Sequence, residues 1–293
     1  MRISDDARQC VVFLGDCNVD GDPSTFRPRA TGFLISLHHQ LAANLAYLVT
    51  VKHFASDGLP FWVRMNTKTG SVAQLIEEPD WAFHDDLTVD VAVVEFNVPS
   101  DAVLTPWDAG AIPTCILTGG SYFGPGDLTY TVGLFRAHRG RSRNIPLVHT
   151  GHIAAFSEDE KIDVADWDSP GKRKAIDAYI VQCSAMPGAS GSPVFIRSGV
   201  KVAKASSTPS PRTSVVSDGI QFVGIPSLES PKAYGTTSLL GIWQGSWELP
   251  NEDAATQNVR YPAGYGIVVP GEKIMEILQM PKLKERREAA RRG

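Results

Sequence analysis

The segment around Ser190 contains the residue types that a serine nucleophile needs. It reads Gly188-Ala189-Ser190-Gly191-Ser192-Pro193. Glycines at 188 and 191 let the backbone turn tightly around the hydroxyl group and approach a bound carbonyl group closely. The N–H groups of Gly188 and Ser190 are candidates for an oxyanion hole, which stabilises the charge that develops during acyl transfer. The alternative interpretation of such a segment is a plain Gly-Ser turn.

A serine hydroxyl is activated when a base takes its proton and a carboxylate orients that base. The candidate base is His53, which follows the apolar run 47–50 and so lies just beyond an expected strand. The candidate carboxylate is Asp90, which precedes the apolar run 91–94, and a carboxylate there needs hydrogen-bonded partners. A lone histidine is more often a capping or surface residue, so the prediction depends on all three residues. Competing residues lie in a segment typical of a surface loop, namely His84, Asp85 and Asp86.

Short apolar runs separated by turn residues recur along most of the chain. This pattern is typical of a β-sandwich or β-barrel. A Pro-, Gly- and Asp-rich stretch from 99 to 126 divides the chain, which predicts an N-terminal β-barrel over 1–112 and a C-terminal β-barrel over 113–270. Within 271–293, the spacing of Ile274, Ile277 and Leu278 predicts one α-helix, followed by a basic tail that either extends the helix or begins a linker.

Charge and cysteine content restrict the function classes. The formal net charge is −4, which argues against bulk attraction to nucleic acid or to an anionic membrane. The four cysteines show neither a CxxC motif nor a metal-ligand spacing, so we expect free thiols in a reducing compartment and no metal site. No segment has the apolar length of a signal-peptide core or a transmembrane helix, which predicts a cytoplasmic protein.

Several segments together resemble the trypsin-like (chymotrypsin-fold) serine peptidases: 31–35 (TGFLI), 48–53 (LVTVKH), 90–94 (DVAVV) and 188–195 (GASGSPVF). The order His, Asp, Ser along the chain also matches that family. Lys52 before the histidine and the Gly-Ser-Pro-Val-Phe continuation are most similar to the bacterial glutamyl-endopeptidase (V8-like) branch.

The resemblance implies a fold and a set of roles. The expected fold is all-β, with two six-stranded antiparallel β-barrels and a C-terminal α-helix. Ser190 would be the nucleophile, His53 the general base and then acid, and Asp90 the residue that orients the imidazole. The family uses no metal and no cofactor, and its substrates are proteins or peptides.

The chain departs from the family at two places. Ala189 precedes the nucleophile where the digestive enzymes have an aspartate, and there is no Ile-Val-Gly-Gly start, so we expect regulation by loop ordering or a protein partner. Alignment places the residues of the specificity pocket at Ser184, Trp243, Gln244, Gly245 and Gly264. Since Trp243 replaces the histidine of the glutamyl endopeptidases, glutamate preference does not follow, and without an aspartate at the base neither does Lys/Arg preference.

The sequence leaves more than one function open. The first hypothesis is an active serine endopeptidase, and the alternative is a trypsin-fold binding or scaffold module with little or no activity. A third combines them in an intracellular protease that is inactive until a regulatory partner binds. The basic loop Arg136–Arg143 is either an anion or partner site or a solvated hairpin tip, and we favour the hairpin tip.

Overall fold

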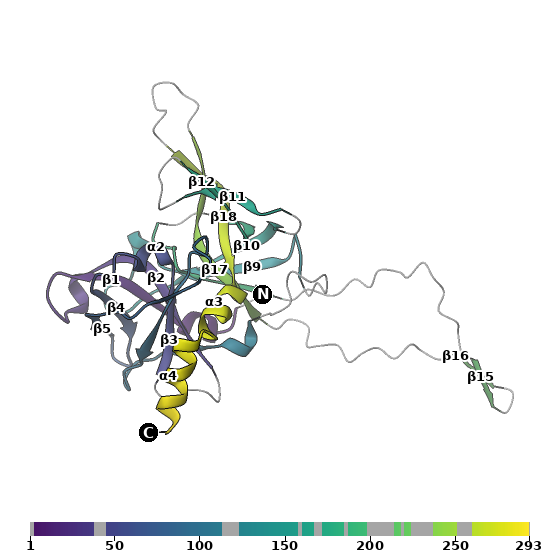
Figure 1. Cartoon of the computed structure of the whole chain (residues 1–293), viewed down its shortest axis with the longest axis horizontal. Helices are drawn as coiled ribbons and strands as arrows, with labels where there is room; N and C mark the ends of the chain where they lie inside the picture. The colour runs from purple at the N-terminus through teal and green to yellow at the C-terminus, as the bar shows by residue number, and fades with distance from the viewer. Residues whose placement is uncertain are drawn as a thin grey trace.

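The computed structural model contains a β-sheet in the N-terminal half, a β-barrel in the C-terminal half and helices at the C-terminus (Figure 1). It describes residues 3–37, 45–112, 123–157, 160–166, 172–184, 187–197, 214–217, 220–223, 237–250 and 260–292. The prediction of a mostly β protein is therefore confirmed. Cys10, Cys17 and Cys183 carry free thiols, and Cys115 lies outside the described residues.

The N-terminal half forms an eight-stranded sheet. Its strands are β1 (Val11–Cys17), β2 (Phe26–Ser36), β3 (Leu45–Thr50), β4 (Phe61–Asn66), β5 (Ser71–Ile76), β6 (Ala82–Phe83), β7 (Ala92–Asn97) and β8 (Trp107–Asp108). They follow the order β5-β4-β1-β2-β3-β7-β6, and β8 pairs with β2. The described pairings thus form an eight-stranded sheet where a six-stranded barrel was expected. The short edge strands β6 and β8, of two residues each, account for the larger strand count.

The C-terminal half forms a closed barrel, as predicted, in the order β10-β13-β18-β17-β14-β9. Its strands are β9 (Leu128–Gly133), β10 (Leu147–Phe156), β13 (Tyr179–Gln182), β14 (Pro193–Arg197), β17 (Thr237–Pro250) and β18 (Arg260–Pro270). Closure removes the unpaired edges that an open antiparallel sheet would expose. Two hairpins pair separately, β11 (Ile162–Ala165) with β12 (Arg173–Ile176) and β15 (Ser214–Ser217) with β16 (Ile220–Val223).

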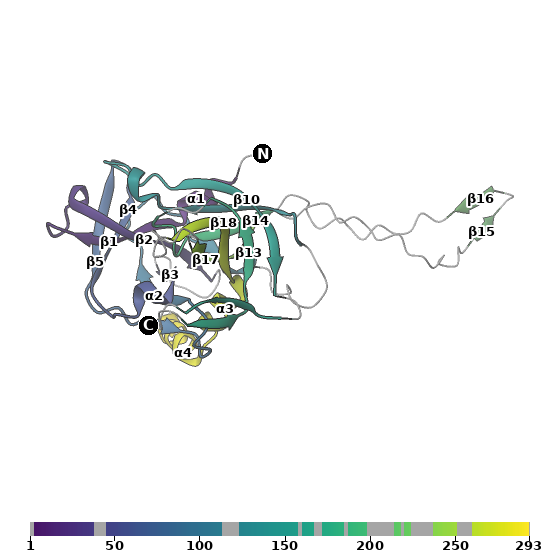
Figure 2. The same ribbon diagram turned by 90° about the horizontal axis from the view of Figure 1, so that it is seen from above.

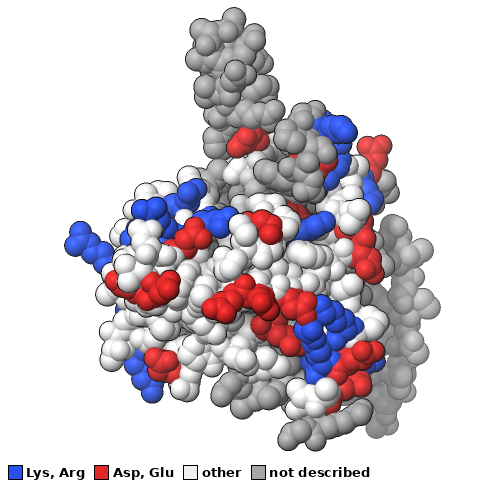
Figure 3. All heavy atoms as spheres, turned by 60° about the vertical axis from the view of Figure 1, so that its left-hand side comes forward, with Lys and Arg blue, Asp and Glu red and all other residues white. Residues whose placement is uncertain are grey.

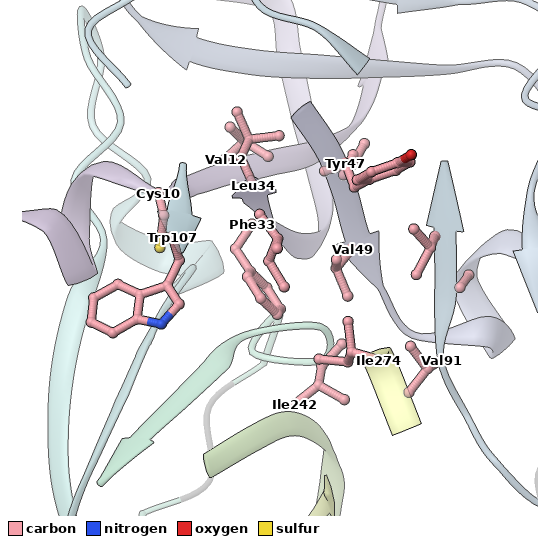
Figure 4. Packing of buried hydrophobic residues seen from close by; sticks show 14 of the residues in the cluster. Cys10, Val12, Phe33, Leu34, Tyr47, Val49, Val91, Trp107, Ile242 and Ile274 are labelled. Atoms are coloured by element: carbon pink, nitrogen blue, oxygen red, sulfur yellow. The ribbon is translucent and has the colours of Figure 1, made fainter. Parts of the chain in front are cut away.

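The sheet and the barrel share one hydrophobic core. Ile242 of the barrel and Ile274 near the C-terminus belong to the same buried cluster as Val49 and Val91 of the sheet (Figure 4). In Figure 2, β1, β4 and β5 lie at the left of the picture, and β10, β13 and β14 lie to their right. Burial of these apolar side chains stabilises the contact between the sheet and the barrel. The shared core therefore holds the two halves in one relative position.

The C-terminal end of the chain forms two helices, α3 (Gly271–Leu278) and α4 (Pro281–Arg292). Ile274, Ile277 and Leu278 are buried, which confirms the predicted helix face. The expected basic tail is a second helix that packs against β3, since the buried Arg287 donates a hydrogen bond of 3.0 Å from Nη1 to the Tyr47 hydroxyl. Leu283 and Arg287, one helical turn apart in α4, are both buried, as the helix-extension alternative for this tail would require.

Short helical turns connect the strands. They are α1 (Asp6–Gln9), α2 (Lys52–Ala55), η1 (Pro23–Thr25), η2 (Ala109–Ala111) and η3 (Arg136–His138). Figure 3 shows acidic and basic side chains mixed over one face, with a row of acidic side chains across it. That face has no extended basic surface, in agreement with the net charge of −4.

Candidate active site

His53 and Asp90 are brought together by the pairing of β3 with β7. Thr50, the last residue of β3, lies opposite Ala92, the first residue of β7. His53 follows three residues after Thr50, and Asp90 precedes Ala92 by two residues. Because the strands are antiparallel, both residues lie beyond the same end of the ladder. The sequence contexts that suggested the two residues therefore correspond to one place in the sheet.

The Asp90 carboxylate binds His53 through both of its oxygens. His53 Nδ1 lies 2.7 Å from Asp90 Oδ2, and the His53 backbone N–H donates to Asp90 Oδ1 at 2.9 Å. Asp90 is 4% exposed, whereas 28% of the His53 side chain is exposed. A buried carboxylate accepts the Nδ1 proton, so Nε2 is the nitrogen that can take and return a proton.

The loop that carries Ser190 is shaped by two glycines in the left-handed region. Gly188 has φ +95° and Gly191 has φ +86°, values that other residue types adopt only with strain. The loop is attached to β17, because Gly191 N donates to Trp243 O at 2.9 Å and Trp243 N donates to Ser192 O at 2.8 Å. Pro193 then begins β14, so a barrel strand fixes the end of the loop.

The proposed oxyanion-hole donors have no hydrogen-bond acceptor within the described residues. The neighbouring N–H groups are occupied, since Gly191 N donates to Trp243 O and Ser192 N donates to Ala189 O. In contrast, the N–H groups of Gly188 and Ser190 donate to no atom of the described residues. Two N–H groups of a tight turn that pair with no described atom are candidates for binding a ligand oxygen.

The Ser190 loop and the His53 strand meet at Thr31 and Thr50. Thr31 N donates to Ser190 O at 2.9 Å, and Thr50 Oγ1 donates to Thr31 O at 2.8 Å. A Cβ atom at Gly191 would lie 2.0 Å from Thr31 O and 2.5 Å from Thr50 Oγ1, so a glycine is needed for this approach. The Ser190 loop thus packs against the strand end from which His53 follows.

The structure brings together only some of the predicted pocket residues. Cys183 N donates to Gly264 O at 2.9 Å, so the exposed Ser184 lies next to Gly264. The Trp243 indole is 2% exposed and belongs to the cluster inside the barrel, where it packs on Gly266. Gln244 is also buried, and its amide atoms have no hydrogen-bond partner among the described residues. Gly245 follows them in β17 and is buried too.

A buried arginine, Arg64, anchors the basic loop, which the sequence analysis did not anticipate. Arg64 Nη1 donates to Asn144 Oδ1 at 3.0 Å and Nη2 donates to Arg141 O at 2.6 Å. Burial lowers the pKa of Arg64 from its usual value. The loop is therefore held against the N-terminal sheet, a contact that the favoured hairpin-tip interpretation did not include. The sequence signal that could have indicated this contact is an arginine inside the apolar run 61–65.

A cavity of about 400 Å³ lies beside this anchored loop, and Arg8, Arg141 and Arg143 are among its lining residues. Among the described residues, no group of three His, Cys, Asp or Glu side chains could hold a metal ion. None of the helices within the described ranges is long and apolar enough to cross a membrane.

The family model described as "Trypsin-like peptidase domain" matches residues 30–203, more than half of the chain. This chain belongs to the trypsin-like peptidase family. The match contains all three candidate catalytic residues. A search of curated protein sequences gave no match.

Solved structures with the same chymotrypsin-like fold include the MamO protease domain from Magnetospirillum magneticum in its apo form. It is 14% identical, the alignment covers 94% of this chain and 98% of that one, and the TM-score is 0.51. The active form of the Rv3671c protease from M. tuberculosis is 14% identical, with 93% and 80% covered and a TM-score of 0.45. The HtrA-type protease AlgW with a decapeptide is 14% identical, with 96% and 73% covered and a TM-score of 0.44.

Proposed function

We propose that this trypsin-like peptidase is an active serine endopeptidase with a Ser190/His53/Asp90 triad. The observation that supports the proposal most directly is the double hydrogen bond between His53 and Asp90 at the strand end next to the Ser190 loop. The same geometry occurs where a carboxylate holds an imidazole in the tautomer required of a general base. A Gly-Ser turn without catalytic use would not need a buried carboxylate paired to a histidine nearby.

The proposed reaction proceeds through an acyl-enzyme. Ser190 Oγ forms a bond to the scissile carbonyl carbon while its proton passes to His53 Nε2, and the oxyanion is stabilised by the N–H groups of Gly188 and Ser190. The C–N bond then breaks as His53 returns the proton to the leaving amine. Water, deprotonated by His53, then attacks the ester carbonyl carbon. The bond from that carbon to Ser190 Oγ breaks as His53 returns the proton to the serine, and the acid is released. Asp90 stabilises the imidazolium that forms in each half-reaction and stays ionised.

Finer features of the proposal rest on the sequence. The V8-like branch is supported by Lys52 and by the Gly-Ser-Pro-Val-Phe continuation, without its glutamate preference. In this proposal Ser184 and Gly264 line the specificity pocket, because Ser184 is exposed and Gly264 is half-buried. The side chains of Trp243 and Gln244 are buried, so these residues would contribute through their main chain. The proposal also includes three features that follow from the sequence alone. They are a boundary between two domains at residues 112/113, a regulatory protein partner and a cytoplasmic location.

Covalent labelling tests the proposed nucleophile. We expect a fluorophosphonate probe to modify the wild-type chain at Ser190, located by peptide mass spectrometry, and a peptide library to be cleaved. Ser190→Ala should lose both activities, with a fall in turnover on the order of 10⁶-fold. Ser56→Ala is the matched control, because Ser56 is exposed and lies close to His53 in the chain, and it should behave as wild type.

Two outcomes would reject the proposal. Cleavage by Ser190→Ala at the wild-type rate would remove Ser190 as the nucleophile. Failure of the folded wild-type chain to label in every state tested, including with candidate partners, would favour the binding or scaffold module.

A further inference from the structure

Thr31 of β2 lies at the junction of the N-terminal sheet and the C-terminal barrel, and it is completely buried. Its hydroxyl group contacts the barrel on two sides. Thr31 Oγ1 donates to Gly188 O at 2.9 Å, and Leu134 N donates to Thr31 Oγ1 at 2.9 Å. Since the Leu134 N–H can only donate, the hydroxyl proton is directed to Gly188 O, and the polarity of both bonds is fixed.

The backbone of Thr31 connects the same loop to the other side of the site. Its N–H donates to Ser190 O at 2.9 Å, and its carbonyl accepts from Thr50 Oγ1 at 2.8 Å. Thr50 ends the strand that His53 follows. One buried residue therefore contacts the two peptide groups that flank the Ala189–Ser190 peptide, and also the strand that leads to the candidate base.

These contacts restrain the peptide groups next to the proposed oxyanion donors. A trans peptide is planar, so a fixed carbonyl also fixes the N–H of the next residue. The carbonyls of residues 187–190 accept in turn from Arg136 N, Thr31 Oγ1, Ser192 N and Thr31 N. Arg136 N and Ser192 N hold the two peptides that carry the Gly188 and Ser190 N–H groups. Thr31 holds the peptides that follow Gly188 and Ser190, so the peptide that carries the Ser190 N–H is restrained on both sides by Thr31.

The local sequence leaves room for this arrangement. A Cβ atom at Gly133 would lie 3.1 Å from Thr31 Oγ1 and 1.9 Å from Ser192 Oγ. A Cβ atom at Gly191 would lie 2.0 Å from Thr31 O. Glycines on both sides thus let the barrel approach Thr31 closely enough for hydrogen bonds.

We propose that Thr31 is a positioning residue that holds residues 188–190 in the conformation required for oxyanion stabilisation and connects them to the strand that precedes His53. This inference rests on the proposed peptidase function. Thr31 contacts the loop through Gly188 O and Ser190 O and does not itself act on substrate. Its loss should therefore reduce kcat, where the oxyanion forms, and leave KM nearly unchanged.

The test compares two substitutions at one buried site. Thr31→Val keeps the shape and removes the hydroxyl, whereas Thr31→Ser keeps the hydroxyl. Removing one oxyanion donor costs on the order of 10² to 10³ in kcat, so we expect Thr31→Val, which only loosens the donors, to lose about 10- to 100-fold. Thr31→Ser should restore most of kcat. Peptide boronate inhibitors, which form a tetrahedral adduct at the serine, should bind Thr31→Val more weakly.

Thr129→Val is the matched control. Thr129 is completely buried in the adjacent strand β9, and its Oγ1 has no hydrogen-bond partner among the described residues. The same chemical change there should leave kcat unchanged. Equal kcat values for Thr31→Val and wild type, or equal losses in Thr31→Val and Thr129→Val, would overturn the inference.

Hydrogen–deuterium exchange gives a readout that does not depend on activity. In the folded proteins, the amides of Gly191 and Ser192 should exchange faster in Thr31→Val than in wild type, and at the wild-type rate in Thr31→Ser and Thr129→Val. Unchanged exchange in Thr31→Val would overturn the positioning role. An inactive wild type would instead reject the proposed function, and exchange would still decide whether Thr31 holds the loop.

Discussion

His53 and Asp90 lie at the ends of two strands that pair directly, whereas Ser190 lies in a loop that is fixed by residues from distant parts of the chain. On the His53 side, one strand register and two hydrogen bonds place the side chains. On the Ser190 side, β2, β17 and the start of the basic loop each contribute a contact. A local ladder positions the proposed acid–base pair, and tertiary contacts position the proposed nucleophile.

This difference predicts how substitutions on each side affect activity and stability. A change at the acid–base side should alter the chemistry and leave the fold intact, because the ladder from β3 to β7 does not depend on the carboxylate. A change in the nucleophile loop should alter both stability and chemistry, because its contacts hold the sheet against the barrel. Three substitutions, from the largest expected effect to the smallest, test the comparison.

Asp90→Asn should have the largest effect on activity, with kcat lower by about 10⁴-fold, because an amide does not hold the imidazole in the required tautomer. Stability should change little, since the asparagine oxygen can still accept the His53 backbone N–H that now donates to Asp90 Oδ1. Steady-state kinetics and urea unfolding measure the two quantities. Near-normal kcat would remove Asp90 from the proposed triad.

Gly191→Ala should reduce both stability and activity. Gly191 has φ +86°, and a Cβ atom would lie 2.0 Å from Thr31 O, so we expect a cost of about 3 kcal/mol in the free energy of unfolding. Gly21→Ala is the control, since Gly21 has φ +74° but nothing within 4 Å, and it should cost about 1 kcal/mol. Equal costs at the two glycines would mean that the packing against Thr31 has no energetic consequence.

Asp80→Asn should have the smallest effect, because Asp80 lies on the surface and pairs with α4. Hydrogen bonds from Lys282 and then Arg286 lower the pKa of Asp80. A lowered pKa in the folded state stabilises the protein above the unfolded value near 4, and this contribution is lost as pH falls through the folded pKa. We therefore expect the free energy of unfolding of the wild type to exceed that of Asp80→Asn by at most about 1 kcal/mol at neutral pH.

The pH dependence distinguishes this ion pair from a packing effect. Urea unfolding at neutral and acidic pH should show the stability gap closing below about pH 4, with kcat equal in the two proteins. A gap that stays constant with pH would mean that Asp80 acts through packing and not through its charge.

Much of the site could be predicted from the sequence because its signals are local. Ser190 is surrounded by glycines that a tight turn requires, and His53 and Asp90 each border an apolar run. The final helix was also evident, since Ile274, Ile277 and Leu278 repeat with helical spacing and are buried. The described structure agrees with each of these local patterns.

Other features could not be read in this way. Arg64 lies in an apolar strand, and its partners around Asn144 follow 80 positions later. The two-residue strands β6 and β8, which enlarge the N-terminal sheet, are too short to produce an alternating pattern. Alignment placed Trp243 in the specificity pocket, but its side chain is buried inside the barrel against Gly266. Alignment does not show which face of β17 points into the barrel.

The sequence by itself determined which residues are candidates for the chemistry, because nucleophile, base and carboxylate are properties of side-chain type. It also showed where the backbone can take unusual φ angles, because glycine supplies them. Only the tertiary structure decided how these residues are held together. Thr31 is 157 positions from Gly188 and 103 from Leu134, and it binds both through one hydroxyl. Such contacts leave no periodic signal, because they form only when the sheet and the barrel bury their common core.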